Sequence, residues 1–161
     1  MDERRDILIL GLGNRLMSDD AAGPLVIDRL AESGVAGARL CDGGTIGMAL
    51  LPDIEASRAL IAVDAAHFDS VPGTVRVFEG AEMDRQLGTK KFSAHDVALS
   101  DLIGAAAMRG TCPARRALVG VQPVQATLGT EPTPAVAAAI GEMAARVLEL
   151  AARWRVEVEA A

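Results

Sequence analysis

The chain has 161 residues, of which 50% are apolar and 24% are charged. This length and composition are typical of one globular domain, and no apolar run is long enough to cross a bilayer. A formal net charge of −6, with three Phe, one Trp and no Tyr, argues against a nucleic-acid partner. Cys41 and Cys112 form no CxxC pair, so neither a disulfide scaffold nor a cysteine zinc site is indicated. We expect one cytoplasmic domain over residues 1–161, with a core of about residues 6–153 and no membrane partner.

Apolar segments along the chain predict strands separated by helices. Continuous apolar runs, typical of strands buried on both faces of a parallel sheet, lie at residues 7–10, 59–63 and 117–121, and weaker candidates lie at 38–41 and 74–78. Helical patterns lie near Pro24, at 48–56, at 96–108 and at 136–150, the last preceded by Thr133 as an N-cap and followed by a short charged tail after Trp154. The alternation predicts an α/β fold: a single three-layer domain with a mostly parallel, doubly wound sheet of about five strands flanked by helices.

The loop after the first predicted strand runs from Gly11 to Asp20. Its glycines at positions 11 and 13 are expected to let the backbone turn sharply and approach a ligand closely. Leu16 occupies the position of the third glycine of a dinucleotide-binding fingerprint, and the adjacent carboxylates of Asp19 and Asp20 would oppose a phosphate. A nucleotide-binding oxidoreductase is therefore supported by the glycines alone.

Acidic residues follow three of the predicted strands. Asp19 and Asp20 lie in the loop after the first, Asp42 opens a glycine turn after the second, and Asp64 follows the third. Because ligands bind outside the carboxyl ends of parallel strands, we expect these side chains to converge at one edge of the sheet. A single Asp in such a place more often closes a turn or caps a helix, so only their convergence favours a site.

The chain has two histidines, and either one could join these acids. His95 lies just before the helical pattern at 96–108, and His67 lies three residues after Asp64. Imidazole and carboxylate groups together suit zinc or nickel. The residues alone therefore predict a nitrogen and oxygen metal site, with His95 and His67 as rival ligands.

The order and spacing of these motifs resemble those of the hydrogenase maturation proteases, which remove the C-terminal extension from the large subunit of nickel-iron hydrogenases. The resemblance extends over nearly the whole chain. The matching segments are residues 7–14 (ILILGLGN), 19–23 (DDAAG), 42–45 (DGGT), 60–65 (LIAVDA), 72–74 (PGT), 93–96 (SAHD), 119–123 (VGVQP) and 133–134 (TP).

The resemblance implies an aspartic-type endopeptidase in which Asp20, Asp64 and His95 contact a metal and Asp42 lies beside them as a further catalytic residue. The metal implied is nickel already inserted in the hydrogenase precursor, which is the expected partner, and other divalent metals could replace it in vitro. Such a metal would fix the precursor segment and polarise the scissile carbonyl or a water, with Asp42 as a candidate general base. Asp20 is Glu in some relatives, and Ala21 is Gly in many. The alternative hypothesis is a non-catalytic, nickel-dependent checkpoint protein of hydrogenase assembly.

Overall fold

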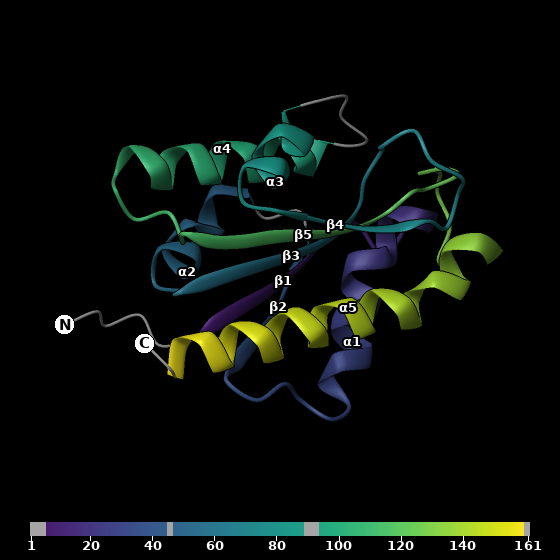
Figure 1. The fold of residues 1–161 in the computed structure, drawn as a ribbon. Helices are drawn as coiled ribbons and strands as arrows, with labels where there is room; N and C mark the ends of the chain where they lie inside the picture. Colours follow the sequence, from purple (N-terminus) through teal and green to yellow (C-terminus); the bar gives the residue numbers. More distant parts are fainter. Residues whose placement is uncertain (1–5, 45–46, 89–93, 160–161) are drawn as a thin grey trace.

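A computed structural model describes residues 6–44, 47–88 and 94–159, and within these ranges it contains one five-stranded sheet in the order β2-β1-β3-β5-β4. Four strands are parallel, and β4 runs antiparallel at one edge beside β5 (Figure 1). The strands are β1 (Ile7–Leu12), β2 (Ala38–Gly44), β3 (Ala59–Ala65), β4 (Val75–Glu79) and β5 (Arg115–Val121). The predicted fold class is therefore confirmed, with one antiparallel edge strand.

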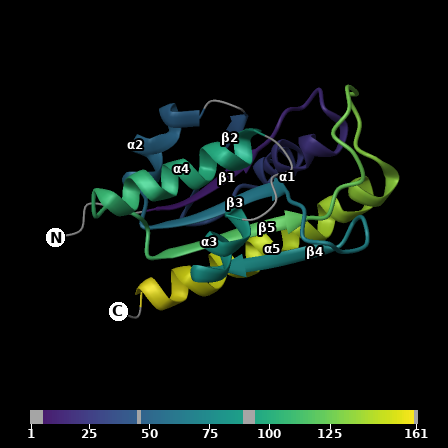
Figure 2. The same cartoon turned by 90° about the horizontal axis from the view of Figure 1, so that it is seen from above.

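Helices cover both faces of the sheet. The helical elements are η1 (Ser18–Ala21), α1 (Ala22–Ala31), η2 (Gly47–Leu50), α2 (Leu51–Glu55), α3 (Ala81–Leu87), α4 (Ala94–Met108) and α5 (Pro134–Glu159), where η marks a 3-10 helix. Figures 1 and 2 show α1 and α5 on one face and α2, α3 and α4 on the other. The three layers predicted from the alternation of strands and helices are present.

The middle strands are apolar without interruption because both of their faces are buried. Along β1, Ile7 and Ile9 pack in the cluster beneath α1 and α5, whereas Leu8 and Leu10 pack in the cluster beneath α4. Successive side chains of a strand point to opposite faces, so a continuous apolar run supplies both cores. This pattern fixes which face each later residue of a strand occupies.

Several helix boundaries differ from the sequence prediction. The predicted helix at 48–56 divides into η2 and the short α2, and α4 begins at Ala94, two residues earlier than expected. The residues after Trp154, expected as a charged tail, continue α5 to Glu159 because Trp154 is buried and holds that turn against the sheet. Thr133 lies where the N-cap was predicted, and its carbonyl oxygen accepts the N–H of Ala137 at 2.8 Å.

The topology brings several element ends to one edge of the sheet. The parallel strands β1, β2, β3 and β5 all end there, and α4 begins near it because its other end must return the chain to the start of β5 (Figure 2). Asp64 lies on the α4 face of β3, in line with Leu60 and Ala62. The start of α4 and the side chain of Asp64 therefore share one face and one edge of the sheet.

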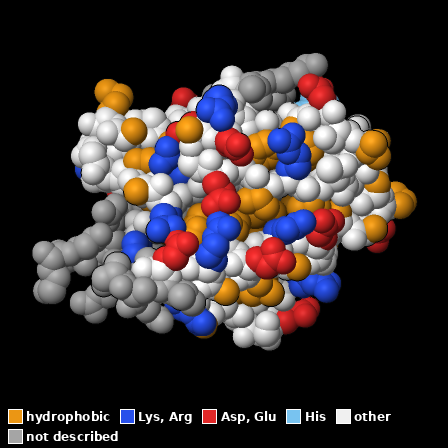
Figure 3. All heavy atoms as spheres, in the orientation of Figure 1, with side chains coloured by type: hydrophobic (Ala, Val, Ile, Leu, Met, Phe, Trp, Pro, Cys, Tyr) orange, Lys and Arg blue, Asp and Glu red, His pale blue; other side chains and the backbone are white. Residues whose placement is uncertain are grey.

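The surface carries both signs of charge. Figure 3 shows acidic and basic side chains interspersed with apolar atoms on the face viewed in Figure 1. One ion pair joins Arg153 of α5 to Glu79 of β4 at 2.5 Å, and exposed pairs of this kind contribute little to stability. None of the helices in the described ranges has the length and apolar character that a membrane span requires.

Candidate functional site

The glycines of the first loop are required by contacts within the chain. A Cβ at Gly13, whose φ is +132°, would lie 1.8 Å from the carbonyl oxygen of Asp20, and one at Gly11 would lie 2.7 Å from that of Gly23. Both distances are far inside van der Waals contact, so the loop folds back onto η1 and α1 at these points. The sharp turn expected of these glycines is present at Gly13, and a Cβ at either position would meet this chain's own atoms. A close approach of this backbone to a ligand stays a prediction.

Asp19 is a fully buried carboxylate that organises the loop after β5. It accepts hydrogen bonds from the backbone N–H groups of Val124 (2.8 Å), Gln125 (3.1 Å) and Thr133 (2.6 Å), and from the Thr133 hydroxyl (2.9 Å). Backbone hydrogen bonds from Ser18 and Gly129 join the same two segments. Asp19 thus has a structural role, and it holds η1 against the segment that leads into α5.

Asp20 and Asp64 are the two buried acids at the carboxyl edge. Their exposed fractions are 4% and 1%, and η1, which carries Asp20, packs against β3, which carries Asp64. One Asp20 oxygen accepts the N–H of Asn14 at 2.9 Å, which orients that carboxylate within the first loop. Buried carboxylates in proteins are paired, hydrogen-bonded or bound to metal. Both side chains therefore need a polar or cationic partner rather than bulk water.

Asp42 lies on the opposite face of the sheet from Asp64. It pairs in register with Gly11, which in turn pairs with Val63, and a Cβ at Gly11 would touch Ile27 of α1. Residues paired in register share a face and successive residues alternate, so Asp42 belongs to the α1 face and Asp64 to the α4 face. The two acids reach the same edge of the sheet from different sides.

Arg15 binds Asp42 and ties it to α1. Its guanidinium donates to Asp42 Oδ2 at 2.8 Å and to both carboxylate oxygens of Asp28 at 2.6 and 2.8 Å, while the second Asp42 oxygen accepts the N–H of Gly44 at 3.1 Å. Hydrogen bonds from Arg15 hold the pKa of Asp28 below its ordinary value. This network fastens the first loop, β2 and α1 to one another.

The predicted histidine ligand lies only partly within the described structure. His95 is in the first turn of α4, at the edge and on the face of Asp64, but its side chain lies outside the described residues. Among the side chains that are described, no three His, Cys, Asp or Glu residues form a group able to hold a metal. The rival set of Asp20, Asp64 and His67 is therefore not assembled.

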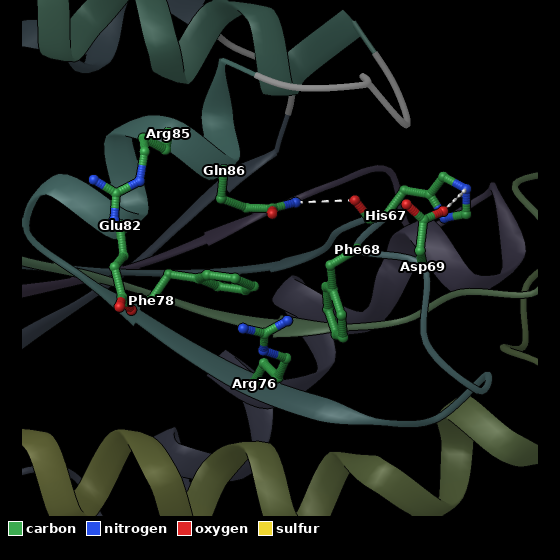
Figure 4. Close-up of a pocket in the computed structure, with 8 residues that line it drawn as sticks. All are labelled: His67, Phe68, Asp69, Arg76, Phe78, Glu82, Arg85 and Gln86. Atoms are coloured by element: carbon green, nitrogen blue, oxygen red, sulfur yellow. Dashed lines mark hydrogen bonds and ion pairs between the residues drawn. The ribbon is translucent and has the colours of Figure 1, made fainter.

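His67 instead contacts Gln122. The Oε1 atom of Gln122 accepts the N–H groups of Phe68 (2.9 Å) and Ser70 (3.2 Å), which leaves its Nε2 atom to face His67 Nδ1 at 2.6 Å. Since an amide nitrogen can only donate, Nδ1 is the acceptor and the neutral imidazole carries its proton on Nε2. His67 is thereby held at the rim of a cavity beside β4 (Figure 4).

The sequence placed Asp19 among the acids of the carboxyl edge but did not reveal its structural role. It gave no indication that Arg15 and Gln122 organise the site. The position of Gln122 could have indicated a role, because it is a polar residue directly after the buried strand β5. Asp64 lies in a similar place, one residue before the end of β3. For Arg15 no local pattern points to partners 13 and 27 residues away.

The fold and the site define a single α/β domain with two buried carboxylates at the carboxyl edge of a mostly parallel sheet. A family model described as hydrogenase maturation protease matches residues 24–150, and the chain belongs to this family of peptidases. The chain is 38% identical over 155 residues to the hydrogenase expression/formation protein HupD of Rhodobacter capsulatus, a match that covers 94% of this chain and 74% of that relative. It is 35% identical over 132 residues to the hydrogenase 2 maturation protease of Escherichia coli, which covers 79% of this chain and 80% of that protein.

The same family is found among solved structures. The hydrogenase maturating endopeptidase HybD from Escherichia coli superimposes with a TM-score of 0.83 at 33% identity, over 89% of this chain and 90% of that one. Three further relatives are matched over 55–58% of their own length.

Proposed function

We propose that this chain is an endopeptidase that removes the C-terminal extension of a nickel-iron hydrogenase large-subunit precursor after nickel insertion. The observation that carries the proposal is the position of Asp64, which is 1% exposed at the carboxyl end of the central strand, beside η1 and on the face where α4 begins. Membership of the hydrogenase maturation proteases supplies the reaction class.

In this proposal Asp20, Asp64 and His95 contact the nickel that the precursor carries. Two carboxylates and an imidazole suit this metal, and the burial of both acids favours a cation over bulk water as their partner. The nickel belongs to the substrate, so a precursor without metal lacks the group that these residues recognise. Cleavage then adds water across the scissile amide and yields a new carboxylate and a new amine.

Asp42 takes a positioning role in this scheme. Both of its oxygens accept hydrogen bonds, from Arg15 and from Gly44, and its side chain lies on the α1 face. Because both oxygens already accept hydrogen bonds within the chain, neither is directed at a substrate water. We therefore assign Asp42 to ordering the first loop through Arg15, while the base stays unassigned.

The test is incubation of the chain with nickel-loaded and nickel-free precursor, followed by mass spectrometry of the large subunit. Only the loaded precursor should lose its extension, and equal processing of both forms would refute metal recognition. Binding of loaded precursor without any change in its mass would instead support the checkpoint alternative.

Variants of the acids separate their roles. The substitutions D20N, D64N and H95A should abolish processing, whereas D42N should retain activity within about tenfold, since positioning contacts contribute less than direct ones. D101N is the matched control, because Asp101 is exposed on α4 and should leave processing unchanged. Normal processing by D64N would remove the basis of the proposal.

A further inference from the structure

A cavity of about 360 Å³ lies between β4, α3 and the segment that follows β3, on the α4 face of the sheet (Figure 4). It is distinct from the buried acids, and the sequence motifs did not point to it. Its lining combines rings and charges from His67, Phe68, Asp69, Arg76, Phe78, Glu82, Arg85 and Gln86.

Arg76 is fixed in this cavity by two aromatic rings. Its guanidinium carbon lies 4.9 Å from the ring centroid of Phe78 and 5.6 Å from that of Phe68, and the two rings meet edge to face at 5.5 Å. Such packing holds the guanidinium plane and reduces the entropy lost when its N–H edge binds a carboxylate through two hydrogen bonds. Among the described residues Arg76 makes no ion pair.

The other charges of the cavity also leave this donor edge available. Arg85 adds a second guanidinium from α3, and it too makes no ion pair with any described residue. Asp69 is directed to solvent, with a side chain 89% exposed, and its Oδ1 atom lies 3.8 Å from Nε2 of His67. With Glu82 the lining has two cations and two carboxylates, so its charges balance and a polyanion is disfavoured. Carboxylate binding rests on the two guanidinium groups, which make no ion pair with a described residue.

The register of the sheet relates this cavity to Asp64. Asp64 pairs with Gly120, and Gly120 pairs with Arg76, so the three residues form one row on the same face. Two strand spacings separate Asp64 from Arg76, which is about 10 Å, or about three residues of an extended peptide. Ala66 and Phe68 cover the middle of this row, because a Cβ at Gly120 would lie 3.3 and 3.5 Å from their side chains. A segment held at Asp64 therefore reaches Arg76 by passing over Phe68, on whose far side the guanidinium is exposed.

We propose that this cavity is a specificity pocket that binds the carboxylate of an acidic residue of the precursor, about three residues from the segment held at Asp64. The identity of the partner rests on the proposed function, whereas carboxylate binding by Arg76 and Arg85 does not. The pocket selects substrate sequence, and the buried acids recognise metal.

Peptide titration tests carboxylate binding without any cleavage. The isotope-labelled full chain is titrated with acetyl-Ala-Glu-Ala-amide, and backbone and arginine side-chain resonances are followed by NMR. We expect saturable shifts around His67 and Arg76, at least fivefold weaker binding of the matching glutamine peptide, and loss of binding in R76Q but not in R146Q, a control on α5. Equal binding of both peptides, or unchanged binding by R76Q with a native unfolding curve, would overturn the pocket. Tighter binding of acetyl-Ala-Ala-Ala with a free carboxyl end would overturn the assignment to a side chain.

Processing kinetics test the link to the substrate. R76Q should raise KM for the loaded precursor at least fivefold while kcat stays within twofold, and R146Q should change neither. An unchanged KM in R76Q would overturn the specificity role. A wild-type chain that binds the glutamate peptide but processes no precursor would refute the proposed protease function and leave the carboxylate site standing.

Discussion

Replacement of Asp19 tests whether a buried carboxylate holds the carboxyl edge of the sheet together. Its two oxygens accept three backbone N–H groups and one hydroxyl, and its exposed fraction is 0%. Hydrogen bonds to a charged group contribute about 1.5–3 kcal/mol each, and a buried donor left without an acceptor costs about 1–3 kcal/mol. The neighbouring Ser18 has a φ of +51°, a conformation that costs about 1 kcal/mol and that the clamp must maintain.

In D19N an amide nitrogen, which is itself a donor, replaces one of the two oxygens. It then faces N–H groups whose hydrogen bonds that oxygen accepted. We expect a loss of about 2–4 kcal/mol in the free energy of unfolding, and about 4–5 kcal/mol for D19A, which leaves every donor unsatisfied. Urea denaturation measures both, and the m value should stay unchanged because the folded state keeps its compactness. D101N, at an exposed position of α4, should stay within about 0.5 kcal/mol of wild type. A cost below about 1 kcal/mol for D19N would show that water or another group replaces the clamp, and the reasoning would fail.

Three further changes test other parts of the structure. G13A should cost at least about 3 kcal/mol in urea denaturation, because its Cβ would meet the η1 backbone, whereas G34A, with φ of +70° and open space, should cost about 1 kcal/mol; equal costs would contradict the packing argument. In R15Q the pKa of Asp28 is no longer held below its ordinary value. A group with a lowered pKa stabilises the fold above its unfolded pKa, so R15Q should be less stable by about 0.5 kcal/mol at pH 7. This difference should begin to shrink near about pH 4 and disappear as the pH falls through the lowered pKa of Asp28. Burial raises the pKa of the Cys41 thiol, so iodoacetamide should modify it several-fold more slowly at pH 8 than in urea, and equal rates would show that the thiol is exposed.

The sheet was predictable from the sequence because its strands are buried on both faces. A run such as residues 7–10 has no polar alternation, which only a strand covered by two helical layers tolerates. The ends of those strands also show where Asp20 and Asp64 lie, since parallel strands end at one edge. The sequence could thus predict the layers of the fold and the edge of the sheet at which these acids lie.

The face of each acid could not be predicted from the sequence. Asp42 was expected just after a strand, but β2 extends to Gly44, and Asp42 is a paired member of its ladder. Because side chains alternate, an error of one residue in register moves a side chain to the other face of the sheet. The bulge between Gly11 and Leu12 adds a further shift that no composition rule reveals.

Long-range hydrogen bonds were equally hidden. Gln122 contacts Phe68 and His67 across more than fifty residues, and these partners are set by the pairing of β3 with β5. Neither partner carries a motif by itself, so the fixed tautomer of His67 follows only from the assembled sheet. The cavity at Arg76 has the same origin, since its rings come from two different segments.

The two faces of the sheet therefore differ in the groups that they present at the carboxyl edge. On the α1 face, Arg15 joins Asp42 to Asp28, and the glycines of the first loop pack against atoms of α1 and η1. The charged groups of this face therefore already have partners within the chain. On the α4 face, Asp64 and Arg76 lie in one row of the sheet. In the proposed scheme an extended precursor segment contacts both Asp64 and Arg76 on this face, passing over Phe68, which covers the row at Gly120. Under the two proposals, substrate recognition and metal recognition use the same face, and Asp42, on the α1 face, has a positioning role.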